Sequence, residues 1–149
     1  MYRKILTPLD GSALAEKALD TAVGLARLTG AELLLFRALV LPSYHFAVPG
    51  AFPVNMAELV EGERTSAQAY LDRLQAVYTE QGLNVRVLLA QGKAAPAILE
   101  VAEREEVDLL VLASHGQGGL ERWVYGSVAE RVLRKSRRNL LLVRSHEEK

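Results

Sequence analysis

The sequence predicts an α/β protein built on a five-stranded parallel β-sheet with helices on both faces, which is a doubly wound fold. Five short apolar runs have the length of buried strands, helical patterns separate them, and Gly, Pro, Asp or Ser marks the changes of pattern. Strands that alternate with helices form right-handed crossovers, which make the strands parallel. Because about half of the 149 residues are apolar, we expect residues 1–149 to form a single domain with a substantial core.

Turn residues bound the first two strands and the helix between them. Ile5 to Leu9 is typical of a short buried strand, and Pro8 near its end indicates that strand pairing finishes there. We expect Ser12 to cap the following helix and Gly30 to end it. The apolar run from Glu32 to Leu41 predicts the second strand.

The middle of the chain begins with an irregular stretch. Pro42 to Asn55 contains three prolines, a glycine and three aromatic residues, so we expect a mobile loop or lid there. A helical pattern then runs from Met56 until Gly82, with an apolar stripe that includes Leu71 and Val77. Val85 to Ala90 predicts the third strand.

Two further strand and helix units complete the pattern. Gly92 and Pro96 flank the start of a shorter helix. Val107 to Ala113 has the β-branched content and the bounded length of a strand that is buried on both faces. Asn139 to Val143 predicts the fifth strand, and we expect the tail after Arg144 to be frayed.

A polar, glycine-rich loop follows the fourth strand and leads into a helix that ends at Lys135, with Gly126 and Ser127 at its start. Free backbone N–H groups and the positive end of the helix dipole meet there, and glycine leaves no side chain to block an anion. This order predicts a site for adenine nucleotide or a related phosphate compound, although such glycines can also serve only as a tight connection. Helix capping explains the hydroxyls of Ser12 and Ser127, and Ser127 gains a phosphate role besides.

Asp10 stands at the carboxyl end of the first strand. In open α/β sheets, ligands bind beyond the carboxyl ends of the strands, at the point where the strand order reverses. If the first and fourth strands are neighbours there, Asp10 and the loop from Gly116 to Ser127 face one crevice. Asp10 can also cap the first helix, and one side chain can do both.

Bulk composition excludes several classes of function. The formal net charge is zero, so nothing in the overall balance indicates binding to nucleic acid or to an anionic membrane. The chain has no cysteine, which excludes disulfides, thiolate catalysis and cysteine metal sites. Met1 to Lys4 leads directly into the first strand, and no apolar run approaches the ~20 residues of a spanning helix. We therefore expect a soluble, cytoplasmic protein.

These motifs resemble the nucleotide-binding branch of the universal stress protein family. The fingerprint of that branch is Gly-x2-Gly-x9-Gly-Ser/Thr, and this chain has Ala113-Ser-His-Gly116, nine residues, and then Gly126-Ser127. The opening KILTPLDGS and the closing NLLLV are also similar to the family's first and last strands, so the resemblance covers nearly the whole chain. It implies a Rossmann-like fold of the adenine nucleotide alpha hydrolase type, with strand order 3-2-1-4-5.

The resemblance also implies the residues of an ATP site. The adenosine would contact the end of the first strand, with Asp10 near the ribose or adenine, and the backbone of the second strand at Ala38. The phosphate chain would lie against the glycine loop and the start of the fourth helix. The implied set is Pro8, Leu9, Asp10, Ala38, Leu112, Ala113, His115, Gly116, Gly126, Ser127 and Val128. The resemblance further implies ATP with Mg²⁺ as the ligand and a homodimer formed through Asn139 to Val143.

The chain departs from the fingerprint at Ala113, where the family has its first glycine. If the position requires a positive φ, an alanine costs about 1 kcal/mol. If it requires a close approach to the ligand, one methyl group must be accommodated. Either effect weakens nucleotide binding without preventing it.

Three classes of function follow from these patterns. The first is an ATP-binding stress or signalling protein that hydrolyses ATP slowly at most. The second is a true ATP-using enzyme, a hydrolase or an adenylating enzyme, which needs a carboxylate for the metal, a placed cation and an oriented nucleophile. Asp10 is the candidate Mg²⁺ contact, but no lysine follows the glycines and Arg122 is the only cation inside the loop. The third is a family member that has lost nucleotide binding and acts through dimerisation and partners.

Other reactive or charged residues have simpler explanations. His115 has no nucleophile or second histidine at a recognisable spacing, so we expect it to line the site. A basic cluster lies at the end of the fourth helix, where cations are favourable, and we expect no nucleic acid to bind it; its residues are Arg134, Lys135, Arg137 and Arg138. A phosphoacceptor receiver would need an aspartate where Ala90 and Gln91 stand. Flavin binding is disfavoured less firmly, because flavin-binding loops vary.

Overall fold

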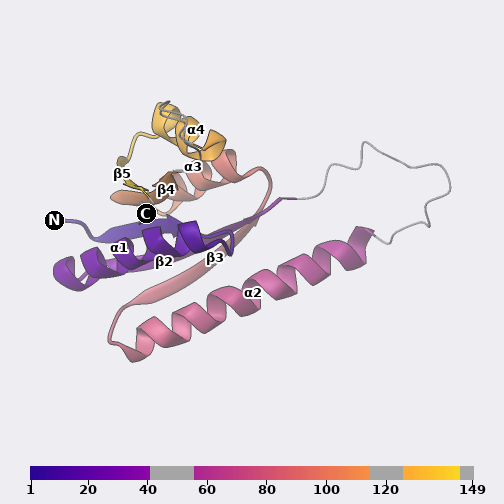
Figure 1. Cartoon of the computed structure of the whole chain (residues 1–149), viewed down its shortest axis with the longest axis horizontal. Helices are drawn as coiled ribbons and strands as arrows, with labels where there is room; N and C mark the ends of the chain where they lie inside the picture. The colour runs from indigo at the N-terminus through magenta and orange to yellow at the C-terminus, as the bar shows by residue number, and fades with distance from the viewer. Residues whose placement is uncertain (41–55, 115–125, 145–149) are drawn as a thin grey trace, which may run out of the picture.

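The computed structural model describes residues 1–40, 56–114 and 126–144, and it confirms the predicted fold class and strand order. The parallel sheet has the order β3-β2-β1-β4-β5 (Figure 1). The strands are β1 (Lys4–Pro8), β2 (Glu32–Leu39), β3 (Val85–Gln91), β4 (Leu109–Ser114) and β5 (Asn139–Arg144). The helices are α1 (Ala13–Thr29), α2 (Met56–Glu80), α3 (Ala94–Arg104) and α4 (Ser127–Lys135).

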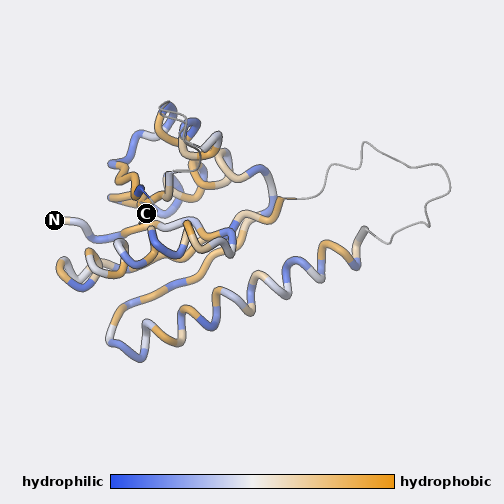
Figure 2. Tube along the Cα trace, viewed as in Figure 1, coloured by the Kyte–Doolittle hydropathy of each residue, from blue (hydrophilic) through white to orange (hydrophobic). Residues whose placement is uncertain are grey.

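Helices cover both faces of the sheet. Figure 1 shows α1 and α2 on one side and α3 and α4 on the other. Successive residues of a strand point to opposite faces, so Ile5 and Leu33 join the core under α1 and α2, while Leu6 and Leu34 join the core under α3 and α4. Strands that are buried on both faces are apolar along most of their length, as Figure 2 shows for the central strands.

The strands on either side of β1 pair with it to different extents. β1 stays in register with β2 as far as Pro8 and Phe36. It pairs with β4 only at Ile5 with Leu109 and at Leu6 with Leu110. Beyond that point the Thr7 hydroxyl, which is fully buried, donates to the carbonyl of Val111 at 3.1 Å. The ladder therefore ends early between the two strands at the reversal of strand order, where ligands of such sheets bind.

The ends of α1 agree with the sequence. The hydroxyl of Ser12 accepts a hydrogen bond from the backbone N–H of Ala15 at 3.2 Å, which makes Ser12 the N-cap. Gly30 takes the left-handed conformation (φ 71°) that ends helices, and its N–H donates to the carbonyl of Ala26. Ser12 thus begins α1 directly after β1, with the intervening Asp10 at the carboxyl edge of the sheet.

Several boundaries and one core residue differ from prediction. β2 ends at Leu39, where its carbonyl accepts from Gly92 N–H, and β4 begins at Leu109 because Val107 N–H still closes the end of α3 through Ala102. Val77 of α2 is 47% exposed, so its place in the apolar stripe was wrong. It lies about 80° around the helix axis from the buried Ala67, at the edge of the stripe.

Some predictions concern residues outside the described part of the chain. They are the loop or lid from Pro42 to Asn55, the site residues His115 and Gly116, and the tail after Arg144. Within the described ranges, no helix combines the length and the apolar character that crossing a membrane would require.

Two cations of the basic cluster at the end of α4 pair with acidic side chains. Arg138 binds Glu103 of α3 with a nitrogen to oxygen distance of 2.8 Å, and Arg134 binds Glu130 one turn earlier in α4 at 2.7 Å. Hydrogen bonding to Arg138 holds the pKa of Glu103 below its ordinary value. These cations therefore have local partners at the end of the helix, where the helix dipole also favours them.

Candidate functional site

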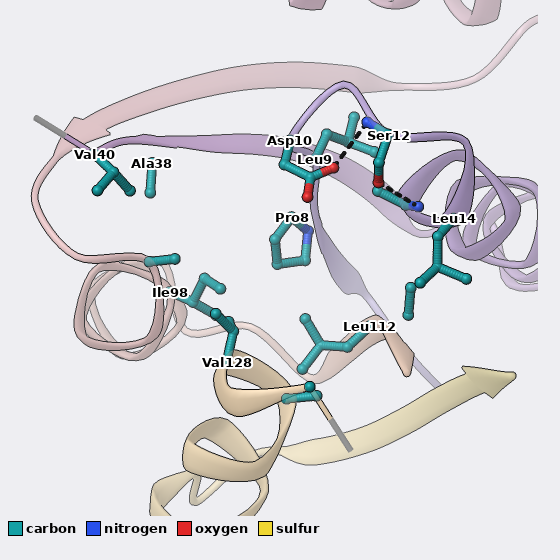
Figure 3. A pocket seen from close by; sticks show the side chains of 15 residues that line it. Pro8, Leu9, Asp10, Ser12, Leu14, Ala38, Val40, Ile98, Leu112 and Val128 are labelled. Atoms are coloured by element: carbon teal, nitrogen blue, oxygen red, sulfur yellow. Dashed lines mark hydrogen bonds between the residues drawn. The ribbon is translucent and has the colours of Figure 1, made fainter. Parts of the chain in front are cut away.

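A pocket of about 300 Å³ lies at the carboxyl ends of β1, β2 and β4 (Figure 3). This volume is at the lower end of the range for small-molecule sites, which is about 300–1,000 Å³. The described residues that line it are Pro8, Leu9, Asp10, Ser12, Leu14, Ala15, Ala38, Val40, Ala94, Ile98, Leu112, Ala113, Gly126, Val128 and Ala129. The pocket therefore lies where the strand order reverses, as the rule for open α/β sheets predicts.

The structure brings most of the predicted site residues together around this pocket. Those from β1 and its turn are Pro8, Leu9 and Asp10, and those from the other elements are Ala38, Leu112, Ala113, Gly126 and Val128. Ser127 lies between two lining residues but is not itself part of the lining. His115 and Gly116 are outside the described residues.

Asp10 supplies the acidic wall of the pocket. Its carboxylate accepts a hydrogen bond from the backbone N–H of Ser12 at 2.9 Å, and Figure 3 shows the carboxylate beside Pro8 at the pocket. Burial alone raises the pKa of Asp10, but hydrogen bonds from Ser12 and from its own backbone, with the positive charge of Arg37, outweigh burial and lower it. Asp10 is therefore a carboxylate anion at neutral pH, and it orders the turn before α1 while Ser12 provides the cap.

The start of α4 forms the opposite wall. Gly126 is the N-cap, and it has no side chain to bond the first N–H groups of the helix. The expectation that the Ser127 hydroxyl caps α4 was wrong, because Ser127 is already the first helical residue. The first N–H groups of a helix have no partner within the helix. This wall therefore presents backbone donors and the positive end of the helix dipole to the pocket.

Ala113 occupies the first position of the glycine fingerprint without backbone strain. It is a residue of β4 in register with Val143, and it is not among the described residues with positive φ. The conformational cost considered for an alanine at this position is therefore not incurred. What remains is its methyl group, which forms part of the pocket lining.

An apolar middle separates the two polar walls, and sequence reasoning missed part of it. Val40 follows β2, and Ala94 and Ile98 belong to the first turns of α3. Figure 3 shows Ala38 and Val40 by the end of β2, Ile98 beside Val128 of α4, and Leu112 on the other side of the pocket. The sequence could have indicated these lining residues only by their positions, because β2 and α3 both have an end at the carboxyl edge of the sheet. Such a surface suits a flat, weakly polar ring.

The charged groups of the lining are few. Asp10 is the only ionisable side chain among the described lining residues. In the same described ranges, no group of three or more His, Cys, Asp or Glu side chains is placed to hold a metal ion. A carboxylate, backbone donors and an apolar middle can bind a ligand that combines an anionic group, hydroxyls and a ring.

Fold and pocket together define the class as a doubly wound α/β protein with a small-ligand site at the carboxyl edge of its sheet. Residues 1–144 match the model of the universal stress protein family, and the chain belongs to that family. The resemblance of the sequence to that family is thereby confirmed.

Relatives of this chain match over nearly its whole length. Universal stress protein MJ0531 of Methanocaldococcus jannaschii is 31% identical over 145 residues, which cover 97% of this chain and 83% of that protein. The solved structure of protein MJ0577 from the same organism is 28% identical, with a TM-score of 0.80 and 99% of each chain covered.

More distant structures share the fold and hold adenine nucleotides. One is a universal stress protein in complex with cAMP, with 23% identity, a TM-score of 0.71, and 95% of this chain and 97% of that chain covered. The other is a family protein of Arabidopsis thaliana with AMP bound, with 15% identity, a TM-score of 0.68, and 97% and 92% covered.

Proposed function

We propose that this protein binds an adenine nucleotide, ATP with Mg²⁺, in the pocket between β1 and β4, and that it acts as a stress or signalling protein. One observation carries the proposal: the Asp10 carboxylate and the start of α4, which no side chain of the described residues caps, lie on opposite walls of the same pocket. An adenine nucleotide has hydroxyls that can donate to a carboxylate and phosphates that suit helix N–H groups. Relatives of the same fold that hold cAMP and AMP support this ligand class.

The ligand would lie along the pocket from its apolar side to α4. Ala38 and Ile98 would flank the adenine ring, and Asp10 would accept from the ribose or the base. Gly126, Ser127 and Val128 would present their backbone N–H groups to the phosphates, together with His115 and Gly116 of the fingerprint. The volume of about 300 Å³ suits the nucleoside part of this ligand.

Mg²⁺ fits the site as a companion of the phosphates. It is commonly held by one or two carboxylates together with phosphate oxygens, so the single carboxylate of Asp10 suffices as its protein contact. When bound, it would neutralise part of the charge of the phosphate chain. Asp10 in its anionic form would orient that ion or its water.

Slow hydrolysis at most is the expected chemistry. Efficient phosphoryl transfer requires a placed cation and a residue that orients the nucleophile. Among the described residues the lining offers neither, since Asp10 is its only ionisable side chain. We therefore favour a binding protein over an ATP-using enzyme. Turnover at saturating ATP separates them, because sustained rates near a typical ~10 s⁻¹ would establish an enzyme.

Binding can be tested with a matched pair of variants. Val128 and Val77 are both exposed helical valines, 37% and 47% exposed respectively, but only Val128 lines the pocket. We expect the wild type to bind ATP, with and without Mg²⁺, in titration calorimetry. Val128→Asp should weaken ATP at least about tenfold through charge repulsion, and Val77→Asp should leave it unchanged. A wild type that binds no adenine nucleotide would instead place the protein among relatives that act through dimerisation and partners.

We further propose that the chain forms a homodimer in the cytoplasm through β5. β5 is an edge strand, and an unpaired edge offers N–H and C=O groups to a second strand. Leu141 of this strand is 36% exposed. Leu133 of α4, the helix that precedes β5 in the chain, is 45% exposed. Pairing of two β5 strands would cover this edge.

A further inference from the structure

We propose that Arg37 is a positioning residue for the nucleotide site, which holds the turn that carries Asp10 so that this carboxylate forms the acidic wall of the pocket. The inference rests on the proposed function. Arg37 does not line the pocket, whereas its neighbour Ala38 does. Because successive residues of β2 point to opposite faces, the Arg37 side chain lies on the face covered by α1 and α2.

The guanidinium of Arg37 lies against the turn between β1 and α1. Its Nη1 atom is 3.6 Å from the position that a Cβ atom on Gly11 would occupy. Gly11 has a φ of 85°, a conformation that other residues rarely adopt. Gly11 thus shapes the turn, and the space where its side chain would stand faces Arg37. Asp10 directly precedes Gly11.

A second contact fixes the guanidinium from the side of α2. The central carbon of the Arg37 guanidinium lies 5.7 Å from the centre of the Tyr70 ring, within the range of a cation–π interaction. The Tyr70 hydroxyl donates to the carboxylate of Glu16 in α1 at 3.0 Å. Burial and then the bond to Glu16 raise the pKa of Tyr70 to about 12, so the phenol remains a neutral donor. Glu16, Tyr70 and Arg37 thereby link α1, α2 and β2 around the turn.

The charge of Arg37 also acts on Asp10. Among the described residues, Arg37 from β2 is the charged group that acts on Asp10, while Glu16 of α1 and Asp10 itself both act on the Tyr70 phenol of α2. Arg37 and Asp10 form no direct ion pair in the described structure, and Arg37 acts on the Asp10 carboxylate through space, where its charge helps to lower the pKa. If Arg37 only fastened α2 to the sheet, its replacement would lower stability without coupling to Asp10 in ATP binding.

A double-mutant cycle between Arg37 and Asp10 separates these two roles. The variants are Arg37→Gln, Asp10→Asn and their combination, with Arg37→Lys as the charge-conserving variant and Arg73→Gln on the exposed face of α2 as the control. ATP affinity is measured by calorimetry, and the titration of the Asp10 carboxyl is followed by carbon NMR without ligand. Urea unfolding verifies that each variant is folded.

We expect Arg37→Gln to weaken ATP about fivefold, the order of magnitude of one charge at this range. The Asp10 titration should move to higher pH in that variant, Arg37→Lys should restore most of both effects, and Arg37→Gln should have no further effect in the Asp10→Asn background. An equal loss in both backgrounds, or an unmoved Asp10 titration, would overturn the inference. If the wild type bound no ATP, the proposed function would fail, and the NMR titration would still decide whether Arg37 controls Asp10.

Discussion

The Asp10 carboxylate accepts a hydrogen bond from the backbone N–H of Ser12 at 2.9 Å, so the acidic wall of the pocket and the cap of α1 belong to one turn. The Ser12 hydroxyl in turn accepts from Ala15 N–H at 3.2 Å. Any change to this turn should therefore affect both the stability of α1 and the candidate site. The following predictions separate these effects.

Replacing Asp10 should make stability less dependent on acid pH. The pKa of Asp10 is lowered in the folded state, so the anion contributes stability above its ordinary value of 3.8. That contribution is lost as the pH falls through the lowered value. In urea unfolding between about pH 2 and pH 6, Asp10→Asn should be less stable than the wild type at the upper end, by less than about 1 kcal/mol because the residue is exposed and its carboxyl only partly buried. The two curves should converge in acid, and a gap that did not change with pH would contradict this.

The two serines at helix starts should differ in their effect on stability. Ser12→Ala removes the N-cap of α1 and should lower the free energy of unfolding by about 1 kcal/mol. Ser127 makes no capping hydrogen bond in α4, so Ser127→Ala should change it by less than about 0.5 kcal/mol. Urea unfolding at neutral pH measures both. Equal losses would mean that Ser127 caps its helix after all.

The hydroxyl of Thr7 should stabilise the point where β1 and β4 separate. It is fully buried and donates to the Val111 carbonyl, so Thr7→Val conserves the shape and removes the donor. We expect a loss of about 1–2 kcal/mol in the free energy of unfolding, because the buried carbonyl loses a partner. Thr21→Val, at an exposed hydroxyl of α1, is the control and should change little. A Thr7→Val protein as stable as the wild type would disprove this role.

A charge on the exposed edge strand should prevent dimer formation. Leu141→Glu places a carboxylate on β5, and two such strands would repel each other in a symmetric pair. Leu28→Glu is a control at an 81% exposed leucine of α1. Sedimentation velocity should show dimers for the wild type and the control, and monomers for Leu141→Glu. Dimers of all three would exclude β5 as the interface.

Sequence reasoning located the elements because their signals are local. Strand runs, the cap at Ser12 and the left-handed Gly30 depend on neighbouring residues only, and the structure has them as predicted. Asp10 and Gly126 could be placed at one crevice because parallel strands bring their carboxyl ends to a common edge.

What depends on tertiary contacts could not be predicted in this way. Val40 and Ile98 line the pocket only because β2 and α3 end beside it, and their sequence neighbourhoods carry no motif. Arg37 is a cation within an apolar strand, and its relation to Tyr70 spans the whole of the intervening loop and half of α2. The identity of the N-cap of α4 also depended on backbone geometry, since Gly126 and Ser127 are both frequent at this position.

The most direct test of the nucleotide site is the ATP affinity of Gly126→Asp, measured by calorimetry alongside its urea stability. Gly126 is buried, but it has φ −52° and ψ 149°, which other residues adopt readily, so the backbone permits an aspartate whose carboxylate would occupy the helix donors. Gly62→Asp, in open space on α2, is the control. We predict that Gly126→Asp remains folded, because the gain from an N-cap offsets the cost of burying its carboxylate, while ATP affinity falls at least about tenfold. Undiminished ATP affinity in this folded variant would contradict the account.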